Sequence, residues 1–144
     1  MGLNYINRAV SERLYYSHGY YDVFADIAFS PHVHDVWEII YFVRGDMSYS
    51  VEGRVYTVKS GDVILTRPSA IHMITPNPGT VYERYCALID FKSIPRQTVK
   101  KIPKERDIFK CRGNERIEGL FSKLDDYCRM FQGEELEHLI IGIF

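Results

Sequence analysis

The chain has 144 residues, enough for one domain with its own core, and its 46% hydrophobic and 26% charged residues are ordinary for a globular protein. A formal net charge of −1 excludes the global positive potential that draws a protein to nucleic acid or anionic membranes. The three widely spaced cysteines form no CxxC pair, and no segment is apolar enough for a signal peptide or a membrane span. We therefore expect a soluble, cytoplasmic protein without disulfides.

Short strands dominate the prediction for the first two-thirds of the chain. We expect them at residues 20–29, 36–43, 47–51, 54–58, 63–68, 71–75 and 81–91, the last of the series. The run 36–43 is almost continuously apolar, which is typical of a strand covered on both faces. Glu52-Gly53 predicts a hairpin turn, because glycine accepts the positive φ that such turns require. This spacing of strands favours a sandwich or small barrel over alternating βαβ units.

The character of the chain changes after residue 91. Residues 92–112 hold eight Lys or Arg against two acids, so we expect a solvated basic connector at residues 92–113. Apolar side chains at three- and four-residue steps predict an amphipathic helix over 114–131. A second helix begins near Glu134 and runs into the wholly apolar end of the chain. Because apolar ends are seldom left in water, we expect a fragment with three parts: a barrel (1–91), the connector (92–113) and a helical segment (114–144).

Three polar residues stand out around the apolar strand at residues 36–43. His32, His34 and Glu38 share one face if the chain is extended from residue 32 to 42, and His72 is a fourth candidate beyond the hairpin. Imidazole nitrogens and a carboxylate suit iron, manganese, nickel or zinc in the divalent state. The same residues can instead line a pocket for an organic ligand, or be ordinary polar residues on a wet strand face.

The spacing of these residues resembles the cupin fold, a small β-barrel also described as a double-stranded β-helix or jelly roll. The first cupin motif is HxH, three residues, Glu, six residues and Gly, and it matches His32, His34, Glu38 and Gly45. The second motif matches at Gly61 and His72, and departs from the pattern at Arg67, Ser69 and Asn77. In cupins that keep all four ligand positions the barrel holds one metal ion. The resemblance therefore implies a site formed by His32, His34, Glu38 and His72.

The order of the parts, a barrel followed by two helices, resembles the N-terminal sensor domain of AraC-type transcriptional regulators. In that family the barrel binds a small-molecule effector, often a sugar, the helices dimerise, and a C-terminal helix-turn-helix domain binds DNA. The resemblance implies a non-enzymatic, homodimeric sensor whose DNA contacts belong to a domain missing from these residues, with no membrane partner. The alternative is a small metal-dependent cupin enzyme of the isomerase or dioxygenase type.

Three further residues join the predicted ligand site. Arg84 and Cys86 share a face of the strand at 81–91 and match pocket-lining positions of the family, and Tyr49 can present its ring to a sugar. A guanidinium offers a rigid fork to hydroxyls or a carboxylate. The alternatives are that Arg84 points to solvent or pairs with Glu83 or Asp90, that Tyr49 is a core residue, and that Cys86 is inert packing.

Overall fold

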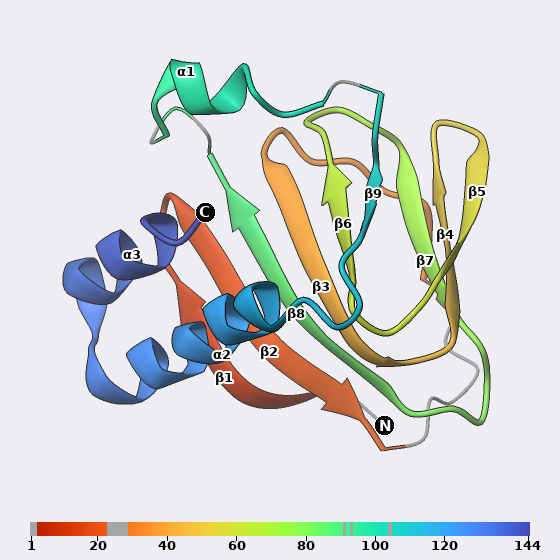
Figure 1. Cartoon of the computed structure of the whole chain (residues 1–144), viewed down its shortest axis with the longest axis horizontal. Coiled ribbons are helices and arrows are strands. Elements are labelled where there is room, and N and C mark those ends of the chain that lie inside the picture. The colour runs from red at the N-terminus through yellow and green to blue at the C-terminus, as the bar shows by residue number, and fades with distance from the viewer. Residues whose placement is uncertain (1–2, 23–28, 91, 93, 104) are drawn as a thin grey trace.

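The structure, a computed structural model, describes residues 3–22, 29–90, 92, 94–103 and 105–144. These ranges contain nine strands and three helices (Figure 1). The strands are β1 (Asn4–Val10), β2 (Leu14–Tyr21), β3 (Trp37–Gly45), β4 (Met47–Val51), β5 (Arg54–Val58), β6 (Asp62–Thr66), β7 (His72–Pro76), β8 (Tyr82–Ile89) and β9 (Ile108–Lys110). The helices are α1 (Arg96–Val99), α2 (Glu115–Met130) and α3 (Gly133–Ile141).

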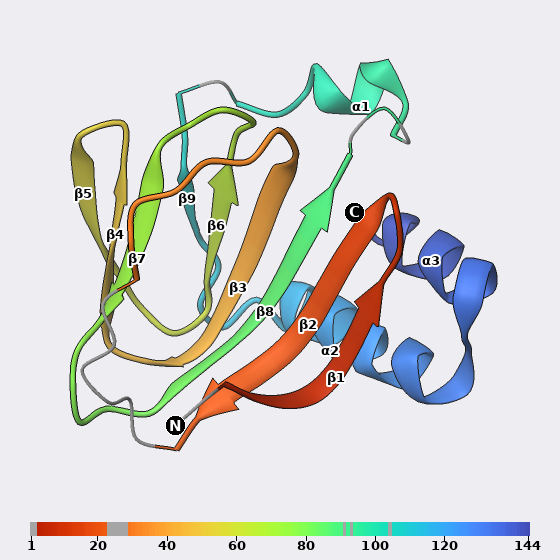
Figure 2. The ribbon, with the colours of Figure 1, turned by 180° about the vertical axis from the view of Figure 1, so that it is seen from behind.

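The strands form two antiparallel sheets. The larger has the order β1-β2-β8-β3-β6-β9, and the smaller has the order β5-β4-β7. Figure 1 shows the small sheet beside β3 and β6, at the end of the molecule away from α2 and α3. Seen from behind in Figure 2, α2 and α3 lie beyond β1 and β2, so the helices cover one face of that end of the large sheet. A mainly β fold with helices after it agrees with the sequence prediction.

Two apolar cores share the strands of the large sheet. On β3, Ile40 and Phe42 belong to the core between the sheets, whereas Ile39 and Tyr41 belong to the core beneath the helices. This alternation explains why residues 36–43 read as continuously apolar, since each face of the strand is covered. Glu38 is on the same face as Ile40 and Phe42, so its carboxylate is directed between the sheets.

Two turns depend on residues with positive φ, and the first is the turn predicted at Glu52-Gly53. Glu52 and Gly53 both have positive φ, 47° and 76°, as the turn between β4 and β5 requires. Gly61, at the corner before β6, also has positive φ, and a Cβ there would lie 2.6 Å from the Cα of Arg112. Glycine is therefore needed at this corner for its backbone conformation and for space.

The strand predicted at residues 20–29 falls mostly on residues 23–28, which lie outside the described residues. β2 occupies Leu14–Tyr21 and pairs with β1 and β8, so it overlaps the prediction only at residues 20 and 21. β1 and β2 were not predicted, and for β2 the reason is that its sequence has no polar alternation. Its two faces contact the two cores, which leaves most of its side chains buried.

The basic segment at residues 92–113 contains α1 and β9, neither of which was predicted. β9 pairs with β6, so β8 is not the last strand of the chain. Asp107 just before β9 is 3% exposed, and its carboxylate accepts hydrogen bonds from Arg67 (2.8 Å) and Tyr56 (3.0 Å) and pairs with Arg54 (3.0 Å). This part of the segment is thereby attached to both sheets.

The two predicted helices are present. Asn114 caps α2 by accepting from the Ile117 amide (3.2 Å). The apolar stripe of α2 faces its own sheet: Phe121 and Leu124 are buried there, and the Phe121 ring stacks on Tyr41 at 4.7 Å. Ile140 of α3 is fully buried in the same core. Among the described residues, no helix is long and apolar enough to cross a membrane.

Candidate functional site

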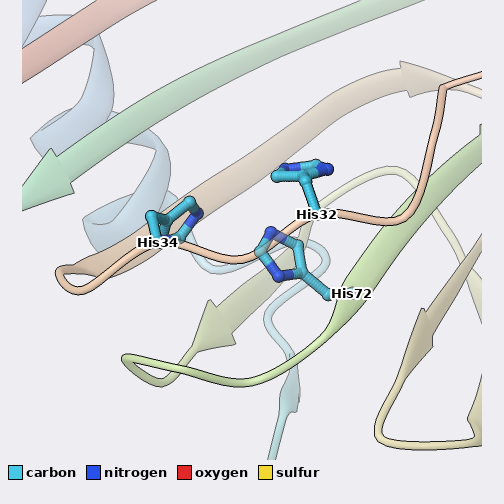
Figure 3. A group of neighbouring side chains, drawn as sticks. All are labelled: His32, His34 and His72. Carbon is cyan, nitrogen blue, oxygen red and sulfur yellow. The ribbon is translucent and has the colours of Figure 1, made fainter.

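Three of the predicted ligands gather between the segment before β3 and the start of β7 (Figure 3). His32 and His72 exchange backbone hydrogen bonds of 3.0 and 3.1 Å, which brings the HxH segment alongside β7. One ring nitrogen from each of His32, His34 and His72 lies within 4.8 Å of the others. Continuous extension from residue 32 is not observed, because residues 35 and 36 form a bend before β3. The bridge to His72, rather than a long strand, places His32 here.

All three imidazoles are held in the same manner. In each ring Nδ1 faces a backbone carbonyl two residues away. Nδ1 of His32 lies 3.0 Å from the carbonyl of Ser30, Nδ1 of His34 lies 3.1 Å from that of Val36, and Nδ1 of His72 lies 2.9 Å from that of Ala70. An Nδ1–H that donates to a carbonyl leaves Nε2 with its lone pair free. Within the described ranges, Nε2 of His34 and of His72 is buried without a hydrogen-bond partner. This is the tautomer and orientation that a metal-binding histidine needs.

Glu38 approaches two of these three rings. Its Oε2 lies 3.0 Å from Nε2 of His72 and 3.7 Å from Nε2 of His34. The contact with His72 is close enough for a hydrogen bond but lacks the alignment of one, and the contact with His34 is too long. Burial raises the pKa of the Glu38 carboxyl, but hydrogen bonds and positive charge from His34 and His72 in their protonated form outweigh burial and hold its pKa below the ordinary value. A carboxylate oxygen and an imidazole lone pair repel each other at this distance unless a proton or a cation is shared between them.

The donor set fits a divalent first-row metal ion. Three imidazole nitrogens with an adjacent carboxylate match the ligand preferences of zinc, nickel, manganese and iron, and two of the nitrogens are buried polar atoms without a partner of their own. His32, His34 and His72, with Glu38 beside them, are the residues that would hold such an ion, which would act as a Lewis acid toward a bound ligand. His32 is exposed and His72 is buried, so such a site would open to solvent on the side of His32.

Tyr49 lies in the core between the sheets, which is the alternative that made it a core residue. Its side chain is fully buried, and its hydroxyl is 2.7 Å from the Thr66 hydroxyl, which in turn donates to Glu38 (3.3 Å). Burial raises the pKa of Tyr49, so the phenol stays protonated. Thr66 was missed by sequence reasoning, because its pairing with Glu38 across β3 and β6 is visible only in the structure.

Arg84 and Cys86 point between the sheets, with neighbours that were not predicted. Arg84 donates to the Ser17 hydroxyl (3.2 Å) and forms no ion pair with Glu83 or Asp90. Cys86 lies 3.5 Å from Oε1 of Glu38, and burial raises the pKa of its thiol to about 12. The thiol is therefore protonated at neutral pH and poorly reactive, in agreement with inert packing.

The family of the domain follows from a comparison with family models. The model of a family described as the AraC-like ligand binding domain matches residues 14–96, more than half of the chain. No curated protein shows significant similarity to the chain.

Solved structures resemble the fold at low sequence identity. A cupin superfamily protein from Desulfitobacterium hafniense has a TM-score of 0.52 and 16% identity, over 62% of this chain and 78% of that one. An RmlC-like cupin with a double-stranded β-helix fold from Methanocaldococcus jannaschii has a TM-score of 0.50 and 12% identity, over 62% and 79%. A putative mannose-6-phosphate isomerase from Ralstonia eutropha has a TM-score of 0.51 and 13% identity, over 62% and 83%.

These likenesses confirm the predicted cupin fold and carry no information about activity, because identities this low show architecture alone. The family match covers β2 to β8 and the first residue of α1, which includes every predicted site residue. The chain belongs to the family of AraC-like ligand binding domains, built on a cupin barrel.

Proposed function

We propose that this domain senses a small polar effector and, through α2 and α3, controls DNA binding by a helix-turn-helix domain outside these residues. The observation that carries the proposal is the cluster of His32, His34 and His72 beside Glu38, with ring nitrogens turned toward one another. An apolar ligand would leave these buried polar atoms without partners, which is costly. A molecule bearing hydroxyls or a carboxylate, such as a sugar, satisfies them directly or through a bound metal ion.

The path from this site to the helices runs along β3. Glu38 and Ile40 face the site, whereas Ile39 and Tyr41, which alternate with them, face the core under the helices. Tyr41 stacks on Phe121 of α2. A ligand that displaces β3 therefore changes the packing surface of α2. Such a ligand shifts the helix only to the extent that it binds the two arrangements with different affinities.

We further propose that the regulator acts in the cytoplasm as a homodimer and that the domain is not an enzyme. The helical segment is the natural place for the dimer contact, because it lies outside the barrel. Light scattering on the whole regulator should give the mass of two chains. A single-chain mass at micromolar concentration would contradict the dimer.

Metal content is the first experiment. The protein purified without chelator should carry close to one first-row metal ion per chain by elemental mass spectrometry, and His72→Ala should lose most of it. His138→Ala, which removes a surface histidine from α3, is the matched control and should keep the metal. A panel of sugars and organic acids is then tested for thermal stabilisation, with and without metal. The sensor proposal fails if no compound stabilises the wild type more than His72→Ala.

The alternative function is a metal-dependent cupin enzyme. The open, solvent-facing position of His32 favours it, because a catalytic metal keeps a coordination site for water or substrate. Turnover separates the two functions. Compounds that bind should be recovered unchanged after long incubation with the metal-loaded domain if it is a sensor, and converted if it is an enzyme.

A further inference from the structure

A second polar cluster lies on the opposite face of the large sheet, beneath α2. At its centre is Asp125, a largely buried carboxylate on the face of α2 that packs against the strands. Asp125 accepts from the Asn7 amide (2.8 Å) and the hydroxyls of Tyr16 (3.0 Å) and Tyr85 (3.1 Å), and its Oδ2 lies 2.7 Å from Nδ1 of His18. One side chain of α2 is thus bonded to β1, β2 and β8.

Both nitrogens of His18 face carboxylates. Nδ1 faces Asp125 at 2.7 Å, and Nε2 lies 3.0 Å from Oε1 of Glu83. A neutral imidazole has one N–H, so its other nitrogen would direct a lone pair at a carboxylate oxygen. An imidazolium donates in both directions. The geometry is therefore that of a protonated His18, and its ring is further fixed by stacking on Tyr85 at 3.9 Å.

The charges around His18 balance only with that proton. His18 and Arg44 are the cations, and Asp125 and Glu83 are the anions, with Arg44 donating to Glu83 from the solvent side (2.5 Å). The titratable and charged groups that face the ring are Asp125 from α2, Glu83 and Tyr85 from β8, and Tyr16 from β2. Two further groups lie behind these: Arg44 of β3 contacts Glu83, and Cys128 of α2 lies near Asp125. Loss of the proton leaves an uncompensated negative charge in a nearly buried site, which is strongly unfavourable.

We propose that His18 is a proton-dependent latch that holds α2 on the barrel, so that the position of this helix responds to pH as well as to an effector. Of the three strands that meet the latch, β2 and β8 lie within the residues matched to the ligand-binding domain. β2 carries Ser17, the partner of Arg84, on its opposite face. The latch itself does not depend on the proposed function. Only its consequence for DNA binding rests on the proposal that α2 and α3 transmit the signal.

The direction of the pH response follows from the surroundings of His18. Burial lowers the pKa of His18, but the bonds to Asp125 and Glu83 outweigh burial, so the pKa lies above the ordinary value of about 6.5. The latch is then at full strength below about pH 6.5. It weakens as the pH rises from there through the raised pKa, because opening in that window releases a proton.

Amide hydrogen exchange of the metal-free domain tests the latch directly. After correction for intrinsic chemistry, exchange of the α2 amides should accelerate by up to about tenfold per pH unit within that window. In His18→Gln, whose side chain cannot be protonated, the corrected exchange should not change with pH. Corrected α2 exchange that is independent of pH in the wild type would overturn the proposal.

Two substitutions on the solvent side of His18 test the latch even if His18→Gln fails to fold. Glu83→Gln removes one carboxylate and should lower the pKa of His18, measured by NMR, by about one pH unit or more. Arg44→Ala removes the exposed cation that competes for Glu83 and should shift the pKa of His18 upward. A His18 ring that titrates identically in both variants, or that carries a single N–H at pH 6, contradicts the latch. Neither readout involves effector or metal, so failure of the sensor proposal leaves this test unaffected.

Discussion

Replacing Asp107 with alanine removes the carboxylate that attaches the segment between β8 and α2 to both sheets. The Asp107 side chain is 3% exposed and interacts with three donors. Arg54 and Tyr56 come from β5 of the small sheet, and Arg67 follows β6 of the large one. The substitution therefore breaks a connection between the sheets, as well as the attachment of the segment itself.

The expected loss of stability follows from what each donor can do afterwards. The Arg54 side chain is 52% exposed and can turn to water at little cost. Arg67 keeps bonds from Nη2 to the carbonyls of Pro103 and Arg106, but its Nη1 loses its partner, as does the Tyr56 hydroxyl. A buried unsatisfied donor costs about 1–3 kcal/mol, but the Tyr56 and Arg67 side chains are only partly buried, so Asp107→Ala should destabilise the domain by about 1–2 kcal/mol. For a chain of this size that lowers Tm by about 3–6 °C.

Urea denaturation followed by circular dichroism measures this change. Asp90→Ala is the control, since Asp90 forms a largely exposed ion pair with Lys92 and its loss should cost no more than about 0.5 kcal/mol. If Asp107→Ala costs as little as the control, the carboxylate does not hold the segment, and the physical account of residues 92–113 as part of the barrel is refuted.

Three further predictions concern packing, a turn and acid stability. Leu124→Ala, on the buried face of α2, should cost about 2–5 kcal/mol in urea denaturation, whereas Met130→Ala at an exposed position of the same helix should cost under about 0.5 kcal/mol. Gly61→Ala should cost more than Gly53→Ala, because both have positive φ but a Cβ at residue 53 meets no atom within 4 Å; equal losses would remove the steric argument. Burial raises the pKa of Asp125, but the hydrogen bonds from His18 and Asn7 outweigh burial and lower the pKa. The ionised carboxylate therefore stabilises the fold fully above about pH 3.9, and this stabilisation is lost as the pH falls below that value. In urea titrations Asp125→Asn should lose less free energy of unfolding on acidification than the wild type.

The sequence predicts the middle of the barrel better than its edges. β3, β4 and β5 are marked by local signals, an apolar run and a Glu52-Gly53 turn, that need no information about distant partners. β2 carries no such signal, because its side chains are buried by the helices on one face and the second sheet on the other, both distant in sequence. β9 has three residues, too few for any periodicity to be visible.

The candidate site was predictable as a set of residues but not as a geometry. The spacing of His32, His34, Glu38 and His72 anticipates three imidazoles in one place, which the structure contains. It does not reveal that Nδ1 of each ring is tied to a carbonyl, since that depends on local backbone orientation. His18 was missed altogether, because its carboxylate partners are 65 and 107 residues away in the chain.

The position of β1 and β2 bears on how the chain assembles during synthesis. Residues 4–21 are synthesised before the residues that they contact, because β2 pairs with β8, Asn7 bonds Asp125 across 118 residues, and Arg13 pairs with Glu137 across 124. Contacts this distant in sequence make folding slow, because long loops must close before any of them forms. The tyrosine-rich hairpin therefore leaves the ribosome without its partners and waits for the rest of the domain. During this interval its unpaired edge and aromatic side chains are open to aggregation and to chaperones.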